Sequence, residues 1–113
     1  MYRKNGPATS KLAVSQHQSK LSERRMQTLE LVSSHPDHTA GELSRAMLAI
    51  YNRILPVRTC VMTPTKRLSE LERMGMVERL NPRKCSDSGY IAHVWRITPL
   101  GKQVIENGGK YDE

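Results

Sequence analysis

The chain contains no phenylalanine, and aromatic residues make up only 4 % of its 113 residues. Proteins that bind single-stranded nucleic acid stack the bases on aromatic side chains, so this composition argues against such a platform. No apolar run is long enough to span a bilayer, and we expect no membrane partner. Residues 1–19 are polar and have no apolar core, so we also expect no signal peptide.

Cysteine and glycine motifs are scarce as well. The two cysteines, Cys60 and Cys85, have no partnered spacing, which favours a reduced cytoplasmic setting over a disulfide framework. His35 and His38 would need a cysteine from a distant loop to complete a zinc site, and there is no Cys-x-x-Cys pair, so we predict no metal and no cofactor. Because a glycine-rich elbow and a phosphate-binding loop are also missing, we expect no enzyme activity.

What the chain has is positive charge. It carries 18 Lys and Arg residues against 11 Asp and Glu, with a net charge of +7 and a pI near 9.8. The excess lies in residues 1–25, 52–74 and 75–85, whereas residues 26–51 and 86–113 are neutral to acidic. A one-sided basic surface of this kind favours a polyanion as partner, most simply nucleic acid.

Local patterns predict one small domain behind a basic arm. Residues 1–18 are rich in Ser and Gln with few apolar residues, and we expect a flexible arm. The helices expected after it cover residues 19–34, then residue 39 to about 51–53, then from a start between Thr59 and Thr63 to Gly75. The second helix is opened by a capping box, Thr39 with Glu42.

The third helix decides most of the interpretation. Thr63 is expected to cap its N-terminus and Pro64 to occupy its first turn. Its core-facing stripe would be Val61, Pro64, Leu68 and Leu71, and the second helix would bury Leu43, Met47 and Ile50 on one face.

After Gly75 the apolar period changes from that of a helix to that of a strand. The elements expected here are a strand over 76–80 broken by Asn81-Pro82, a polar loop over 83–90, a returning strand over 91–98, a short helix over 100–106 capped by Thr98, and a disordered tail over 107–113. The two strands would form a hairpin with a long basic tip.

Three sequence pieces, in this order, resemble a winged helix-turn-helix DNA-binding domain. They are G-E-L-S at residues 41–44, R-L-S-E-L-E-R-M-G-M-V at residues 67–77 and W-R-I-T-P-L-G at residues 95–101. The resemblance covers about residues 19–106 and implies an α+β fold of three helices, a two-stranded wing hairpin and a short C-terminal helix. The run over residues 49–62 is longer than the family's tight turn between its second and third helices.

The resemblance also implies a DNA-binding mode, with the third helix in the major groove and the wing on the backbone or minor groove. The DNA-contacting residues that it implies here are Arg58, Met62, Thr63, Thr65, Lys66, Arg67, Ser69, Arg73, Arg83 and Lys84. Lys66 and Arg67 can pair with guanine edges or phosphates. Glu70 would repel phosphate, so we expect it to bond a cytosine amino group or, within its own helix, Lys66 or Arg73.

The function implied is a double-stranded DNA-binding transcriptional regulator of bacterial or phage type, cytoplasmic and acting as a homodimer. Two alternatives stay open. One is a winged-helix module that docks an acidic patch of another protein, and the other is a replication or recombination accessory factor that binds DNA without sequence choice. The polar face of the third helix is also compatible with an ordinary solvated surface.

Overall fold

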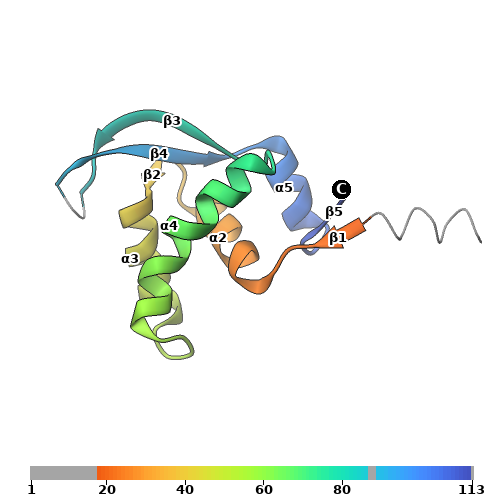
Figure 1. The fold of residues 1–113 in the computed structure, drawn as a ribbon, viewed down its shortest axis with the longest axis horizontal. Helices are drawn as coiled ribbons and strands as arrows, with labels where there is room; N and C mark the ends of the chain where they lie inside the picture. The colour runs from red at the N-terminus through yellow and green to blue at the C-terminus, as the bar shows by residue number, and fades with distance from the viewer. Residues whose placement is uncertain (1–17, 87–88, 113) are drawn as a thin grey trace, which may run out of the picture.

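The computed structural model describes residues 18–86 and 89–112 (Figure 1). The elements are β1 (Gln18–Lys20), α2 (Glu23–Ser34), β2 (His38–Thr39), α3 (Ala40–Tyr51), α4 (Val57–Arg73), β3 (Val77–Lys84), β4 (Ile91–Ile97), α5 (Pro99–Glu106) and β5 (Lys110–Asp112). The fold is α+β, as the sequence predicts, with four helices in the described part of the chain. Two antiparallel sheets accompany them, with strand orders β2-β4-β3 and β1-β5. No helix in this part is both long and apolar enough to cross a membrane.

Three of the four helix starts follow from local capping. The prediction that the first helix begins at residue 19 was wrong, because residues 18–20 form β1 and α2 begins at Glu23. Ser22 accepts a hydrogen bond from a backbone N–H in the first turn of α2, and Thr98 does the same for α5. Both halves of the capping box of Thr39 and Glu42 are formed at the start of α3. These side chains satisfy backbone N–H groups that lack partners within the helix, so the signal is local and readable from sequence.

The start of α4 was predicted wrongly. The helix begins at Val57, before the predicted window, so Thr63 and Pro64 lie inside it. The Thr63 hydroxyl donates to the Thr59 carbonyl oxygen at 2.6 Å instead of capping a helix end. Proline normally disfavours a helix interior because it has no N–H. Here Pro64 is fully buried, and its packing in the core outweighs the missing hydrogen bond.

The core-facing stripe of α4 differs accordingly. Cys60 is buried where Val61 was expected, and Val61 is exposed. Pro64, Leu68 and Leu71 face the core as predicted.

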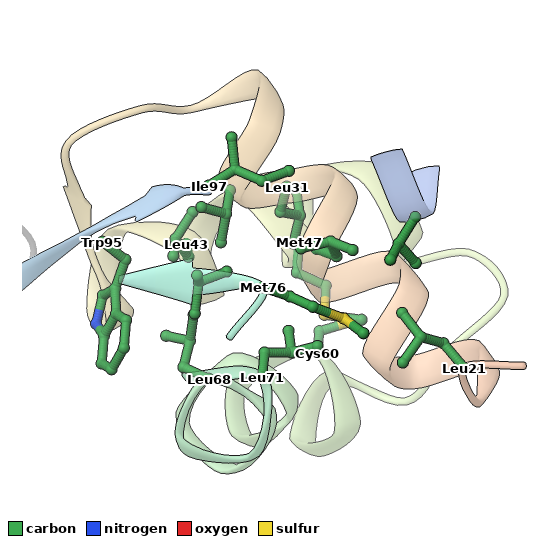
Figure 2. Close-up of a cluster of buried hydrophobic side chains, with 14 residues drawn as sticks. Leu21, Leu31, Leu43, Met47, Cys60, Leu68, Leu71, Met76, Trp95 and Ile97 are labelled. Atoms are coloured by element: carbon green, nitrogen blue, oxygen red, sulfur yellow. The ribbon is translucent and has the colours of Figure 1, made fainter. Parts of the chain in front are cut away.

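The hydrophobic core lies between α2, α3 and α4 and beneath the hairpin. Figure 2 shows it as a continuous cluster that runs from Trp95 at one end to Leu21 at the other. The largest completely buried side chains include Leu29, Leu43, Met47, Leu68, Leu71, Met76 and Val104. Burying such a side chain contributes about 1.5–3 kcal/mol, so this cluster fixes α4 with one face inward and the opposite face in solvent.

The hairpin is longer than expected. β3 continues through Asn81-Pro82, where the prediction placed a break, and only its pairing register shifts between Arg79 and Pro82. Proline is tolerated there because β3 is an edge strand, with one side of its backbone unpaired. Arg83 and Lys84 therefore lie on a strand and not in a loop. In Figure 1 the hairpin extends along one side of the helices.

The C-terminal segment pairs with the N-terminal one. The tail predicted to be disordered includes β5, which pairs with β1, and the Leu21 N–H donates to the Gly109 carbonyl oxygen at 2.9 Å. Gly108 and Gly109 have φ values of +70° and +94°, which glycine adopts readily, and this turn directs the chain back toward β1. The predicted flexible arm lies outside the described residues, except for Gln18, which begins β1.

Candidate nucleic-acid interface

One face of α4 is exposed along the whole length of the helix. We call it the cationic stripe, and it consists of Arg58, Met62, Thr65, Lys66, Ser69 and Arg73. These positions recur every three or four residues and so lie on one side of the helix. All six were predicted DNA contacts, and the stripe contains three positive and no negative side chains.

The two acidic residues of α4 are held away from this stripe by arginines. The Glu70 carboxylate accepts hydrogen bonds from Arg25 of α2 at 2.8 Å and from Arg67 at 3.0 Å. The hydrogen bond from Arg25 is the main reason that the pKa of Glu70 lies below its usual value. Glu70 therefore bonds within the protein, as one alternative predicted, but to different partners from the expected Lys66 and Arg73.

Glu72 is bound in the same way on the other flank of α4. Its carboxylate accepts from Arg79 of β3 at 2.8 Å, and this contact lowers the pKa of Glu72. The guanidinium of Arg79 also lies over the ring of Trp95, 5.6 Å from its centroid. In contrast, Arg58, Lys66 and Arg73 have no ion-pair partner within 4 Å among residues 18–86 and 89–112. These three charges thus form no close ion pair in that part of the chain, although Arg73 is near enough to Glu70 and Glu72 to contribute to lowering the pKa of each.

A cleft adjoins the stripe where the N-terminus of α2 meets the first half of α4. This α2–α4 cleft has a volume of about 390 Å³ and is lined by Ser22, Arg24, Arg58, Thr59, Met62, Thr63, Lys66 and Arg67. The lining supplies four cationic side chains and no acidic one. Backbone N–H groups at a helix N-terminus also favour anions, so the cleft suits a phosphate group.

Three lining residues of the cleft, Ser22, Arg24 and Thr59, were not among the predicted DNA contacts, and only Arg24 is charged. Arg24 was counted only as part of the basic N-terminal region, because nothing local shows that α2 packs against α4. Its guanidinium also hydrogen-bonds Glu23 and Gln27, at 3.0 and 3.1 Å. Thr63, although predicted to face outward, is 7 % exposed and uses its hydroxyl within the helix.

The predicted wing residues differ from one another in their surroundings. Arg83 forms a two-point ion pair with Glu42, at 2.7 and 3.0 Å, and donates to the Asp37 carbonyl oxygen at 2.8 Å. Its charge is therefore engaged within the protein. Lys84 is exposed on the same strand.

Glu42 is the centre of this second cluster. Besides Arg83 it accepts from the Thr39 N–H at 3.0 Å, from the Ser86 N–H at 2.9 Å and from the Ser86 hydroxyl at 2.7 Å. Its side chain is 8 % exposed. These contacts, the ion pair with Arg83 first, hold the pKa of Glu42 far below its usual value despite the opposing effect of burial. The sequence identified Glu42 only as a helix cap. In the fold it also connects α3 to the outer part of the hairpin through its bonds to Arg83 and Ser86.

The histidines and cysteines considered above as metal ligands are His35, His38, Cys60 and Cys85. The rings of His35 and His38 meet edge to face, with centroids 5.3 Å apart, and Cys60 and Cys85 are both buried. In the part of the chain that the structure describes, no group of three or more His, Cys, Asp or Glu side chains is placed to hold a metal ion.

Neither a protein-family model nor a curated protein matches this sequence. What the molecule does is therefore inferred from the positions and charges of its own residues. The feature with the clearest chemical meaning is the cationic stripe with its adjoining cleft, since Arg58 and Lys66 belong to both and form no ion pair within the described residues.

Proposed function

We propose that the protein is a winged helix-turn-helix transcriptional regulator of bacterial or phage type that binds double-stranded DNA with α4 in the major groove. The observation that carries the proposal is the cationic stripe, from which both acidic residues of α4 are withdrawn by arginines on other elements. The element order supports it, because three helices followed by an antiparallel hairpin is the arrangement that the resemblance implies. The protein acts in the cytoplasm by binding, without catalysis.

The length of the stripe indicates that its ends and its middle contact different parts of the DNA. Arg58 and Arg73 are separated by about 22 Å at about 1.5 Å per residue, which exceeds the width of the major groove, about 12 Å. The two arginines at the ends are therefore suited to the phosphate backbones on either side. The segment from Met62 to Ser69 is about 10 Å long and fits within the groove, where Lys66 can reach a guanine edge.

The α2–α4 cleft would position the helix on the backbone. A phosphate seated there could bond Arg58, whereas Arg24 and Arg67 are already paired with Glu23 and Glu70. Contacts to phosphate fix the orientation of a protein on the duplex without reading sequence. Arg83, which is bound to Glu42, contributes less to this proposal than Lys84, which is exposed at the same end of β3.

Selection of duplexes from a random pool, followed by binding measurements across salt concentrations, tests the proposal. A specific regulator enriches one motif and binds it about 10³-fold or more tightly than random duplex. Lys66→Ala should lower affinity for the selected site and relax base preference at one position. The matched control is Lys102→Ala, which removes another exposed lysine, on α5 and away from the stripe.

Other outcomes separate the alternatives. Retained affinity without an enriched motif would favour an accessory factor that binds DNA without sequence choice. Weak binding to all duplexes at physiological salt would favour a protein-docking module and would refute the proposal. Sedimentation of the complex gives the number of copies per duplex, for which the sequence predicts two.

A further inference from the structure

Four large aliphatic side chains are exposed where α3 meets α4. Ile50, Ile54, Val57 and Val61 have exposed fractions of 58, 72, 59 and 46 %, and we call them the apolar corner. The sequence pattern predicted that Ile50 and Val61 would face the core, and the structure places both at the surface. Single exposed aliphatics are ordinary, but several within a short segment mark an interaction surface.

The corner is a well-defined piece of structure. The N–H groups of Ile54 and Leu55 both donate to the Tyr51 carbonyl oxygen, at 3.0 and 2.9 Å, so the chain continues in a tight turn after α3. Leu55 and Tyr51 pack against the core and anchor this turn from inside. The Ser44 hydroxyl donates to the Val61 carbonyl oxygen at 2.7 Å and ties α4 to α3. In Figure 1 the α3–α4 connection forms one end of the molecule, opposite the hairpin.

Along the chain segment that forms the corner the charge is of one sign, although Glu23 and Glu30 of α2 lie near Tyr51. Residues 43–69 contain five Lys and Arg residues and no Asp or Glu. Arg53 and Arg58, both exposed, directly flank Ile54 and Val57 in the sequence. An apolar surface rimmed by cations complements a partner that combines aliphatic side chains with carboxylates.

The same charge argues against a second copy of this chain as the occupant. A two-fold interface centred on the corner would bring Arg53 and Arg58 of one molecule close to the same residues of the other, since such interfaces pair identical surfaces. Nucleic acid also fits less well, because its charged phosphate groups gain no favourable contact with the four aliphatic side chains. Ile50 and Ile54 also lie outside the cationic stripe, on α3 and the turn after it.

We propose that the apolar corner docks an acidic, aliphatic segment of a partner protein, such as an amphipathic helix with Leu or Ile on one face and Asp or Glu beside it. The aliphatic face covers the four exposed side chains, and the carboxylates pair with Arg53, which lies outside the cationic stripe. This mode is that of a helix laid on an apolar surface, with charge fixing its orientation. The protein would then recruit a partner through one end of the α3–α4 pair while the cationic stripe, on another face of α4, remains available to DNA.

A synthetic amphipathic helix with Leu on one face and Glu on the other is the probe. Two companion peptides of equal length carry Lys in place of Glu, or Ser in place of Leu. Fluorescence polarisation at physiological salt should detect binding of the Leu–Glu peptide by the full chain, and amide chemical shifts should change first over residues 50–61. Neither companion peptide should bind comparably.

Variants locate the site and keep the test independent of DNA binding. The double variant Ile50→Ser, Ile54→Ser should weaken the Leu–Glu peptide at least tenfold, and Arg53→Glu should do the same. Leu100→Ser, which removes an exposed aliphatic side chain from α5, is the matched control and should change nothing. Lys66→Ala should leave peptide binding intact, and the double variant should keep its duplex affinity and melting temperature.

Several results would overturn the proposal. They are no binding of the Leu–Glu peptide, equal binding of a companion peptide, or binding unaffected by the double variant. A wild-type dimer that the double variant converts to monomer would show that a second copy covers the corner instead.

Discussion

Replacing Glu42 with glutamine tests whether one carboxylate holds the hairpin to α3. The two oxygens of Glu42 accept five hydrogen bonds, two from Arg83, two from Ser86 and one from the Thr39 backbone. A glutamine amide offers one acceptor oxygen, and its NH₂ group would face the donors that the other oxygen now serves. If the NH₂ group takes the place of Oε1, two hydrogen bonds are lost. If it takes the place of Oε2, three are lost.

The expected loss of stability follows from these contacts. A hydrogen bond to a charged group contributes about 1.5–3 kcal/mol, but such terms do not add, and Arg83 and Ser86 are themselves exposed. We therefore expect Glu42→Gln to lower the free energy of unfolding by about 2–3 kcal/mol at neutral pH. In a domain of this size that corresponds to a fall in melting temperature of roughly 10–15 °C.

The pH dependence gives the sharper signature. Because folding holds the pKa of Glu42 far below its usual 4.5, the stabilisation is complete above about pH 4.5 and is lost as the pH falls below it. The difference in unfolding free energy between wild type and variant should therefore shrink on acidification. Urea unfolding at pH 7 and at successively lower pH measures it, with Glu106→Gln, an exposed carboxylate on α5, as control. A difference below about 0.5 kcal/mol at pH 7, or one independent of pH, would refute the reasoning.

Two further substitutions test other parts of the structure. Gly101→Ala should lower the free energy of unfolding by about 3 kcal/mol or more, because an added Cβ would collide with the Met76 carbonyl oxygen. Urea unfolding measures this, and a loss within about 0.5 kcal/mol would show that the backbone between β4 and α5 shifts to accommodate the methyl group. Glu70→Gln should raise the affinity for random duplex several-fold and steepen its salt dependence, because Arg25 and Arg67 lose their shared carboxylate beside the α2–α4 cleft. Unchanged duplex affinity in a titration against wild type would place this pair of arginines outside the DNA interface.

Sequence reasoning succeeded where a signal is local. The cap at Thr98 and the capping box at Thr39 place their hydrogen-bonding side chain within three residues of its backbone partner, so the pattern alone locates α3 and α5. The same holds for the stripe of α4, because residues three or four apart share a face wherever the helix begins.

Sequence-based prediction failed where contacts with a distant segment of the chain determine the local structure. Thr63-Pro64 is a good start signal for a helix, yet burial of Pro64 in the core extends α4 back to Val57. Residues 110–112 carry no strong strand pattern, and they form a strand by pairing with β1, from the other end of the domain. Pro82 lies within a strand because that strand is at the sheet edge, which no local pattern reveals.

The sequence by itself determined the α+β class, the capped helices and the clustering of positive charge, because each depends on neighbours along the chain or on composition. Only the tertiary structure decided which charges are engaged. Arg25, Arg79 and Arg83 reach carboxylates on other elements, whereas Arg58 and Lys66 reach none among the residues that the structure describes. The physical reason is that an ion pair requires two groups within about 4 Å, and for residues far apart in sequence the packing of the core sets that distance.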